Sequence, residues 1–190
     1  MFYMKEWSED LDLSEFYLTC AEKGFTNNLS EKVLIDPLRK EKEWNCWILH
    51  CDDDPIGSVA AHSFDDVMGP NTYRILARTC AFKKYAPNKG MFKNKVMIEH
   101  QHFTDQFFVP ACIEWAGDHR VFATSNSIGD TPVKSQRFVH NHYFPMLEKL
   151  GLVTKIDTIM YKNTLQSIWE IHKKAFLQRL NEYPRWVDYD

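Results

Sequence analysis

The N-terminal part of the chain combines one short apolar segment with two helical patterns. Residues 2–4 fit a short edge strand. Asp12 and Glu15 form a start similar to a capping box, and the apolar residues that follow lie at helical spacing. Asp36 and Pro37 fit the N-cap and the first position of a second, short helix. We therefore expect a strand and two helices here.

The pattern then changes from helix to strand. Aromatic and β-branched residues dominate Trp44–Cys51, and a run of turn residues separates this segment from a second apolar segment at residues 56–64. These two segments predict a hairpin. A polar loop follows, and a third strand is expected at residues 73–82.

Helical spacing returns in the second half of the chain. Residues 93 to about 119 predict a long helix, which Pro110 should kink or split because proline lacks the backbone N–H. Residues 121–125 predict a compact buried strand. Residues 132–150 predict another helix, in which Pro145 weakens the pattern locally.

The C-terminal part predicts a final hairpin from residues 156–162 and 165–172, followed by a tail helix within residues 172–190. The whole order is then β-α-α-β-β-β-α-β-α-β-β. A strand, a long helix and another strand lie at its centre, which implies an α/β (α+β) fold with helices on both faces of a central mixed sheet. No linker-like segment divides the chain, so we expect one domain over residues 1–190.

Composition supports a globular protein with a real core. Apolar residues make up 44% of the 190 residues, and no segment reaches the roughly 20 consecutive apolar residues of a membrane span. The N-terminus lacks the basic and apolar regions of a secretory signal. The five cysteines include no Cys-x-x-Cys pair, which favours reduced thiols. We therefore expect a cytoplasmic protein with no membrane partner.

Charge is segregated along the chain, although the net charge is only −3. Residues 67–98 contain no acid and seven basic residues, and residues 41–66 contain seven acids and a single lysine. Charge runs are usually solvated faces. The alternative is an anion site built from the middle of the chain, with an acidic neighbour that holds a cation.

The element order and four short segments resemble the GNAT N-acetyltransferases. Residues 78–85 resemble the fourth strand of that family and the turn into its phosphate loop, and residues 88–92 lie where this loop meets the long helix. Residues 121–126 resemble the fifth strand, which often ends in Asn. Residues 148–152 resemble the end of the following helix.

The resemblance implies acetyl-CoA, or another acyl-CoA, as co-substrate and no metal. The carrier would lie where the fourth and fifth strands splay apart, with its pyrophosphate at the N-terminus of the long helix, inside the basic segment. The implied cofactor-binding residues are Cys80, Ala81, Phe82, Lys89, Gly90, Met91, Phe92, Lys93 and Asn126.

The reaction implied by the resemblance is direct attack of an amine, from a small molecule or a protein, on the thioester. Leu147 occupies the position of the family's usual tyrosine, and Tyr143 is the nearest substitute as proton donor to the thiolate. A core aromatic is the alternative role for Tyr143. For the base, His62 and Glu99 are both candidates.

Two aspartates after the second strand of the hairpin are candidates to bind a cationic amine substrate, and a solvated turn is the alternative. They are Asp65 and Asp66.

Other functions stay open at this stage. The single glycine of the phosphate loop and the missing tyrosine also suit a GNAT-fold module that binds or scaffolds without catalysis. A metal site is suggested by His100, His102, His140 and His142, but histidines two apart on a helix point to opposite sides. The basic segment with interleaved aromatics suggests nucleic acid, and the overall acidity argues against it. A homodimer is also left open.

Overall fold

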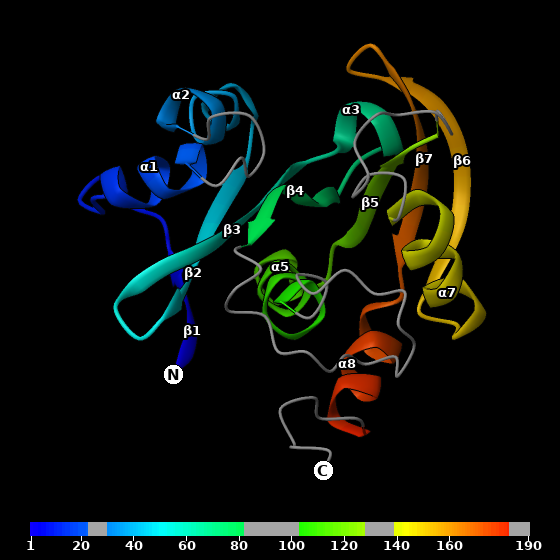
Figure 1. Cartoon of the computed structure of the whole chain (residues 1–190). Helices are drawn as coiled ribbons and strands as arrows, with labels where there is room; N and C mark the ends of the chain where they lie inside the picture. The colour runs from blue at the N-terminus through cyan, green and yellow to red at the C-terminus, as the bar shows by residue number, and fades with distance from the viewer. Residues whose placement is uncertain (23–29, 82–102, 128–138, 183–190) are drawn as a thin grey trace.

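The computed structural model describes residues 1–22, 30–81, 103–127 and 139–182 (Figure 1). These residues form one seven-stranded sheet in the order β1-β2-β3-β4-β5-β7-β6. All neighbouring strands are antiparallel except β4 and β5, which are parallel. The mixed sheet that the sequence predicts is confirmed. Its strands are β1 (Phe2–Glu6), β2 (Trp44–Cys51), β3 (Asp54–Ser63), β4 (Thr72–Ala81), β5 (Arg120–Asn126), β6 (Val153–Tyr161) and β7 (Thr164–Ile171).

Helices cover both faces of the sheet. Residues 45–50 of β2 and 56–62 of β3 are buried without interruption, which requires cover on each side of these strands. In Figure 1, α1 and α2 lie beside β2 and β3, whereas α5 and α7 lie by β4, β5 and β6. The described helical segments are α1 (Ser14–Glu22), α2 (Glu31–Leu34), η1 (Leu38–Lys40), α3 (Asp65–Met68), η3 (Thr104–Phe108), α5 (Val109–Ala116), η4 (Val139–Tyr143), α7 (Phe144–Lys149) and α8 (Lys173–Glu182).

The short helix predicted from Asp36 and Pro37 is present as the 3-10 segment η1, but Pro37, not Asp36, is its N-cap, and the separate helix α2, which ends at Leu34, precedes it. Arg39 pairs with Asp36 at 2.7 Å, so this aspartate holds the turn through its side chain rather than capping a helix. The short helix α3 also replaces part of the loop expected before β4.

Two prolines are accommodated in the same way, each by a π-helical segment that directly precedes its α-helix. Pro110 and Pro145 each lie in the first turn of an α-helix that directly follows a π-helical segment, η3 before α5 and η4 before α7. A π turn shifts the hydrogen-bond spacing by one residue, so the missing N–H and the ring of proline fit without ending the helix. The helical segment therefore continues through Pro110, with a change from π to α geometry instead of the predicted kink or split. The predicted start of this helix at Lys93 lies outside the described residues.

The parallel strands β4 and β5 pair over only three residues. Thr72, Tyr73 and Arg74 pair with residues 120–122, and no pairing continues beyond Arg74, although β4 runs to Ala81 and β5 to Asn126. The strands therefore diverge towards their carboxyl ends.

Two bulges bend β4 where it leaves β5. His62, Ala60 and Ser58 of β3 pair with Arg74, Ala77 and Cys80, so each step of two residues in β3 spans three in β4. Leu76 and Arg78 accordingly have positive φ angles of 58° and 52°, which are unusual for residues with a side chain.

The main core lies between the sheet and its helices and includes four buried cysteines. None of the five cysteines, all of which lie within the described residues, is in a disulfide; they are Cys20, Cys46, Cys51, Cys80 and Cys112. The predicted reduced thiols thus belong mostly to the core.

We predict that Ile48→Ala lowers the free energy of unfolding by about 2–5 kcal/mol, because Ile48 is fully buried in β2 and its truncation leaves a cavity. Met160 on the edge strand β6 is 69% exposed, so Met160→Ala should change the free energy of unfolding by no more than about 0.5 kcal/mol. Denaturant titration measures both, and equal losses would contradict the described burial.

Candidate functional site

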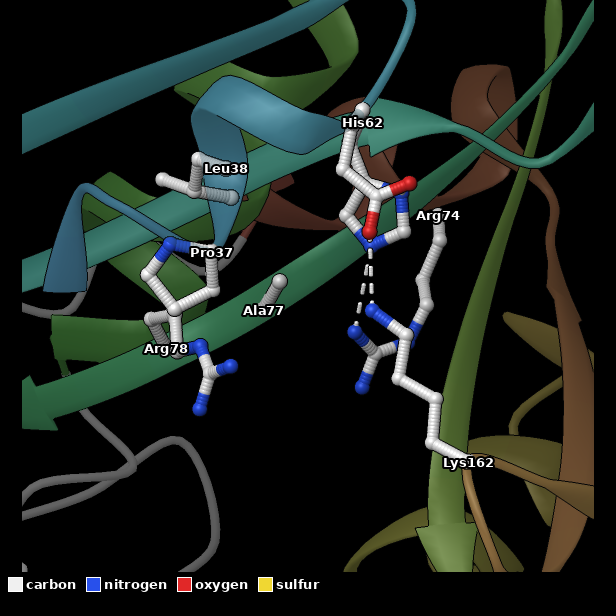
Figure 2. Close-up of a pocket in the computed structure, with 8 residues that line it drawn as sticks. Pro37, Leu38, His62, Arg74, Ala77, Arg78 and Lys162 are labelled. Atoms are coloured by element: carbon white, nitrogen blue, oxygen red, sulfur yellow. Dashed lines mark hydrogen bonds and ion pairs between the residues drawn. The ribbon is translucent and has the colours of Figure 1, made fainter. Parts of the chain in front are cut away.

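A pocket of about 120 Å³ lies beside the bulges of β4 (Figure 2). Four parts of the chain form its wall: the turn around η1, the end of β3, the bulged part of β4 and the turn between β6 and β7. Its lining residues are Pro37, Leu38, Glu41, His62, Arg74, Ala77, Arg78 and Lys162.

Arg74 connects the two strands at the point where they part. It forms the last pair of β4 with β5, opposite Phe122, and its Nε and Nη2 donate to Thr124 Oγ1 at 3.1 and 3.0 Å. Its Nη1 donates to His62 Nε2 at 3.3 Å, and its guanidinium lies 5.3 Å from the ring centre of Tyr161. Burial lowers the pKa of Arg74, but an arginine remains charged at neutral pH.

His62 is a buried, neutral hydrogen-bonding residue. Its Nδ1 lies 2.8 Å from the carbonyl oxygen of Ser63, so this nitrogen carries the proton and Nε2 accepts from Arg74. Burial first, and then the charge of Arg74, lower the pKa of His62 to about 4. The lone pair that a general base would use is therefore occupied, and the predicted role of His62 as base stays a prediction.

Glu41 provides the one carboxylate among the lining residues. Its Oε1 accepts a hydrogen bond from Lys162 Nζ at 2.8 Å, and its Oε2 lies 3.6 Å from His62 Nδ1. Burial alone would raise its pKa, but the hydrogen bond from Lys162 and the nearby positive charges outweigh burial and lower it. Glu41 is thus ionised at neutral pH and faces three cations, Arg74, Arg78 and Lys162.

Tyr143 lies in the core rather than among the residues that line this pocket. Its side chain is 1% exposed, and its hydroxyl donates to Asp105 Oδ1 at 2.5 Å. The segment η4 that carries Tyr143 packs on β5, one of the two diverging strands. Its catalytic role stays a prediction. Asp105 was missed by the sequence reasoning, although a single acid within an aromatic helical segment was a usable signal.

Some of the predicted cofactor residues lie at the diverging strands. Cys80 is buried near the end of β4, with its Sγ 3.4 Å from Ser58 Oγ, and Asn126 ends β5 opposite Gln166. Ala81 is the last residue of β4. The others, together with Glu99, lie outside the described residues: Phe82, Lys89, Gly90, Met91, Phe92 and Lys93.

The two predicted substrate-binding aspartates have other partners. Asp65 Oδ1 accepts the backbone N–H of Thr72 at 3.1 Å, which closes the turn before β4. Asp66 is largely exposed and pairs with Lys42 at 3.3 Å. Neither lines the pocket beside β4.

The pocket residues were visible in the sequence only as members of charge blocks. Glu41 belongs to the acidic segment, and Arg74 and Arg78 belong to the acid-free basic segment that follows it. The pocket brings the two blocks together. The sequence did not indicate that Lys162 belongs to this pocket, because it lies in the turn between β6 and β7, far along the chain from the other charged lining residues.

Within the described ranges, no group of three or more metal-ligating side chains comes together. In the same residues, no helix has both the length and the apolar character needed to cross a bilayer.

No protein-family model and no curated protein sequence matches the chain. Solved structures do match. An aminoglycoside N-acetyltransferase has a TM-score of 0.57 at 11% identity, over 93% of this chain and 99% of that one. A probable GNAT-family acetyltransferase from Chromobacterium violaceum has a TM-score of 0.56 at 7% identity, over 92% of this chain and 89% of that one. The ribosomal-protein-S18-alanine N-acetyltransferase of Escherichia coli has a TM-score of 0.53 at 8% identity, over 90% of this chain and 93% of that one. The chain therefore has the GNAT fold.

The low pKa of His62 predicts a loss of stability at acidic pH. The unfolded chain takes up a proton near pH 6.5, whereas the folded one does so only near 4, so unfolding is favoured as the pH falls through this window, by up to about 3 kcal/mol. His62→Gln keeps a donor and an acceptor but does not titrate, and its stability should vary less between pH 6.5 and 4. Urea titrations at several pH values measure this.

The exposed Asn141 supplies the control, since Asn141→Ala removes no titratable group and should keep the wild-type pH dependence. Parallel pH curves for wild type and His62→Gln would contradict the assignment of a neutral His62.

Proposed function

We propose that this GNAT-fold protein transfers an acyl group from acyl-CoA to an amine acceptor. The observation that carries the proposal is the divergence of β4 and β5 after only three paired residues. The N-acetyltransferases among the matching structures support the same class of reaction.

The divergence suits an extended thioester carrier. Buried backbone N–H and C=O groups need hydrogen-bond partners, and two parallel strands that stop pairing leave such groups on their facing edges. The amides of a pantetheine arm are suited to pair with them, as an added strand would. We propose acetyl-CoA as the donor, with its phosphates near the basic segment that follows β4.

The acceptor amine would enter through the pocket beside β4. This pocket lies next to Arg74, at the place where the strands part, so an amine bound there would face a thioester held between β4 and β5. The amine nitrogen forms a bond to the acyl carbon, the C–S bond breaks, and the proton lost by the amine restores the thiol.

Two roles in proton transfer follow the sequence prediction. Tyr143 would donate to the leaving thiolate, from the segment that packs on β5. The base stays open between His62 and Glu99, and for His62 it requires release of Nε2 from Arg74.

Acetyl-CoA binding tests the proposal directly. At about a hundred times its Kd, acetyl-CoA should raise the free energy of unfolding by about 2.7 kcal/mol. We expect Asn126→Ala, at the end of β5, to weaken binding by roughly 2- to 10-fold, because one hydrogen bond is lost. The exposed Asn141 provides the control, since Asn141→Ala should bind as the wild type does. Calorimetric titration measures these affinities, and absence of binding to the wild type would refute the proposal.

Tyr143→Phe tests the proton donor. The ring is kept, so acetyl-CoA affinity should stay within about twofold while kcat for CoA release falls by roughly 10²- to 10⁴-fold. A purely structural tyrosine would give lower stability, through the lost bond to Asp105, with kcat unchanged. Binding of acetyl-CoA without CoA release on a broad panel of amines would favour a non-catalytic binding module instead.

A further inference from the structure

The pocket beside β4 is positively charged in a protein that is negatively charged overall. Arg74, Arg78 and Lys162 carry three positive charges and Glu41 one negative charge, whereas the chain has a net charge of −3. His62 adds no charge because it is neutral at pH 7. The remaining excess of two positive charges attracts an anion to a place where the proposed reaction needs an amine.

Arg78 is the cation best placed to receive that anion. It stands at one of the two bulges of β4, has a positive φ angle of 52° and is exposed. Its guanidinium makes no hydrogen bond or ion pair with any described residue, and Figure 2 shows it beside Ala77 and Pro37 without a partner among the residues drawn. A guanidinium presents paired donors that match a carboxylate.

Lys162 and Glu41 form an ion pair that a ligand can replace. The ammonium of Lys162 reaches Glu41 from the β6–β7 turn, and about half of the lysine side chain is exposed. A ligand ammonium at Glu41 would release Lys162, which then stands free to bind an anion. The pair is therefore complementary to a ligand with both charges: Glu41 matches the ligand's ammonium, and Lys162 matches its anionic group.

We propose that the acceptor is an amine that also carries a carboxylate, as an α-amino acid does. Its amine replaces Lys162 at Glu41, and its carboxylate binds Arg78 and the released Lys162. This inference rests on the proposed acyl transfer and names its acceptor class.

The dimensions of the pocket favour a small acceptor. Its volume of about 120 Å³ is well below the roughly 300–1,000 Å³ of sites for drug-sized ligands, so it admits the charged end of a small molecule. Arg74 remains bound to Thr124 and His62 and supplies a fixed positive background.

The test compares paired ligands with the full-length protein. The panel holds the standard α-amino acids, their carboxamides, which keep the amine but lose the carboxylate charge, and phosphoethanolamine. Calorimetry measures binding in the presence of CoA, and thiol release measures transfer from acetyl-CoA. For at least one amino acid, affinity and kcat/KM should exceed those of its carboxamide by roughly 10- to 100-fold.

The variants Arg78→Gln and Lys162→Gln should each reduce this ratio to within a few fold of one. In Arg78→Gln the reason is loss of affinity for the amino acid, whereas in Lys162→Gln the carboxamide should also bind more tightly, because its amine no longer has to displace the lysine from Glu41. The matched control Lys42→Gln removes a surface lysine that pairs with Asp66, outside the pocket, and should keep the wild-type ratio. Circular dichroism confirms that each variant is folded.

The outcomes separate this inference from the proposed function. Equal use of amino acids and carboxamides, or an unchanged ratio in both variants, overturns the inference and leaves acyl transfer standing. Tighter binding of phosphoethanolamine than of any amino acid overturns the carboxylate assignment. Failure of the wild type to bind acetyl-CoA refutes the proposed function, and selective binding of amino acids would still support the assigned pocket.

Discussion

The structure depends on one half-buried arginine at the point where two parallel strands separate. Arg74 donates from β4 to Thr124 on β5 and to His62 on β3, so it links three neighbouring strands just where backbone pairing between β4 and β5 stops. A buried guanidinium is costly unless its donors are satisfied. Thr124 and the neutral His62 meet this requirement, and the strands beyond them can diverge.

The same requirement determines the electrostatics of the pocket. His62 must offer a lone pair to Arg74, so it is held neutral, and the positive charge of Arg74 is left without a carboxylate of its own. Glu41 is the nearest acid, and it is bound by Lys162. The uncompensated charge then lies towards Arg78, which is the basis of the proposed binding of an anion in this pocket. The strand divergence and the proposed preference for an anionic group therefore have one physical origin.

Local irregularities place this pocket beside the open edge of β4. Each of the two bulges inserts one residue, turns the strand and moves Arg78 out of the regular alternation of side chains. The π turns before Pro110 and Pro145 keep both helices continuous, so they still pack on β4, β5 and β6. Irregular backbone is thus used both to open the site and to keep the core closed.

The sequence by itself determined the order of strands and helices and the strand Trp44–Cys51, because periodicity and turn residues act over short distances. It placed the start of the second helix at Asp36, whereas the helical segment there is capped by Pro37 and Asp36 pairs with Arg39. Only the tertiary structure decided which charges meet. Glu41 and Lys162 are 121 positions apart, and Arg74 and Thr124 are 50 apart. Such contacts follow from strand order and register, and no local pattern carries that information.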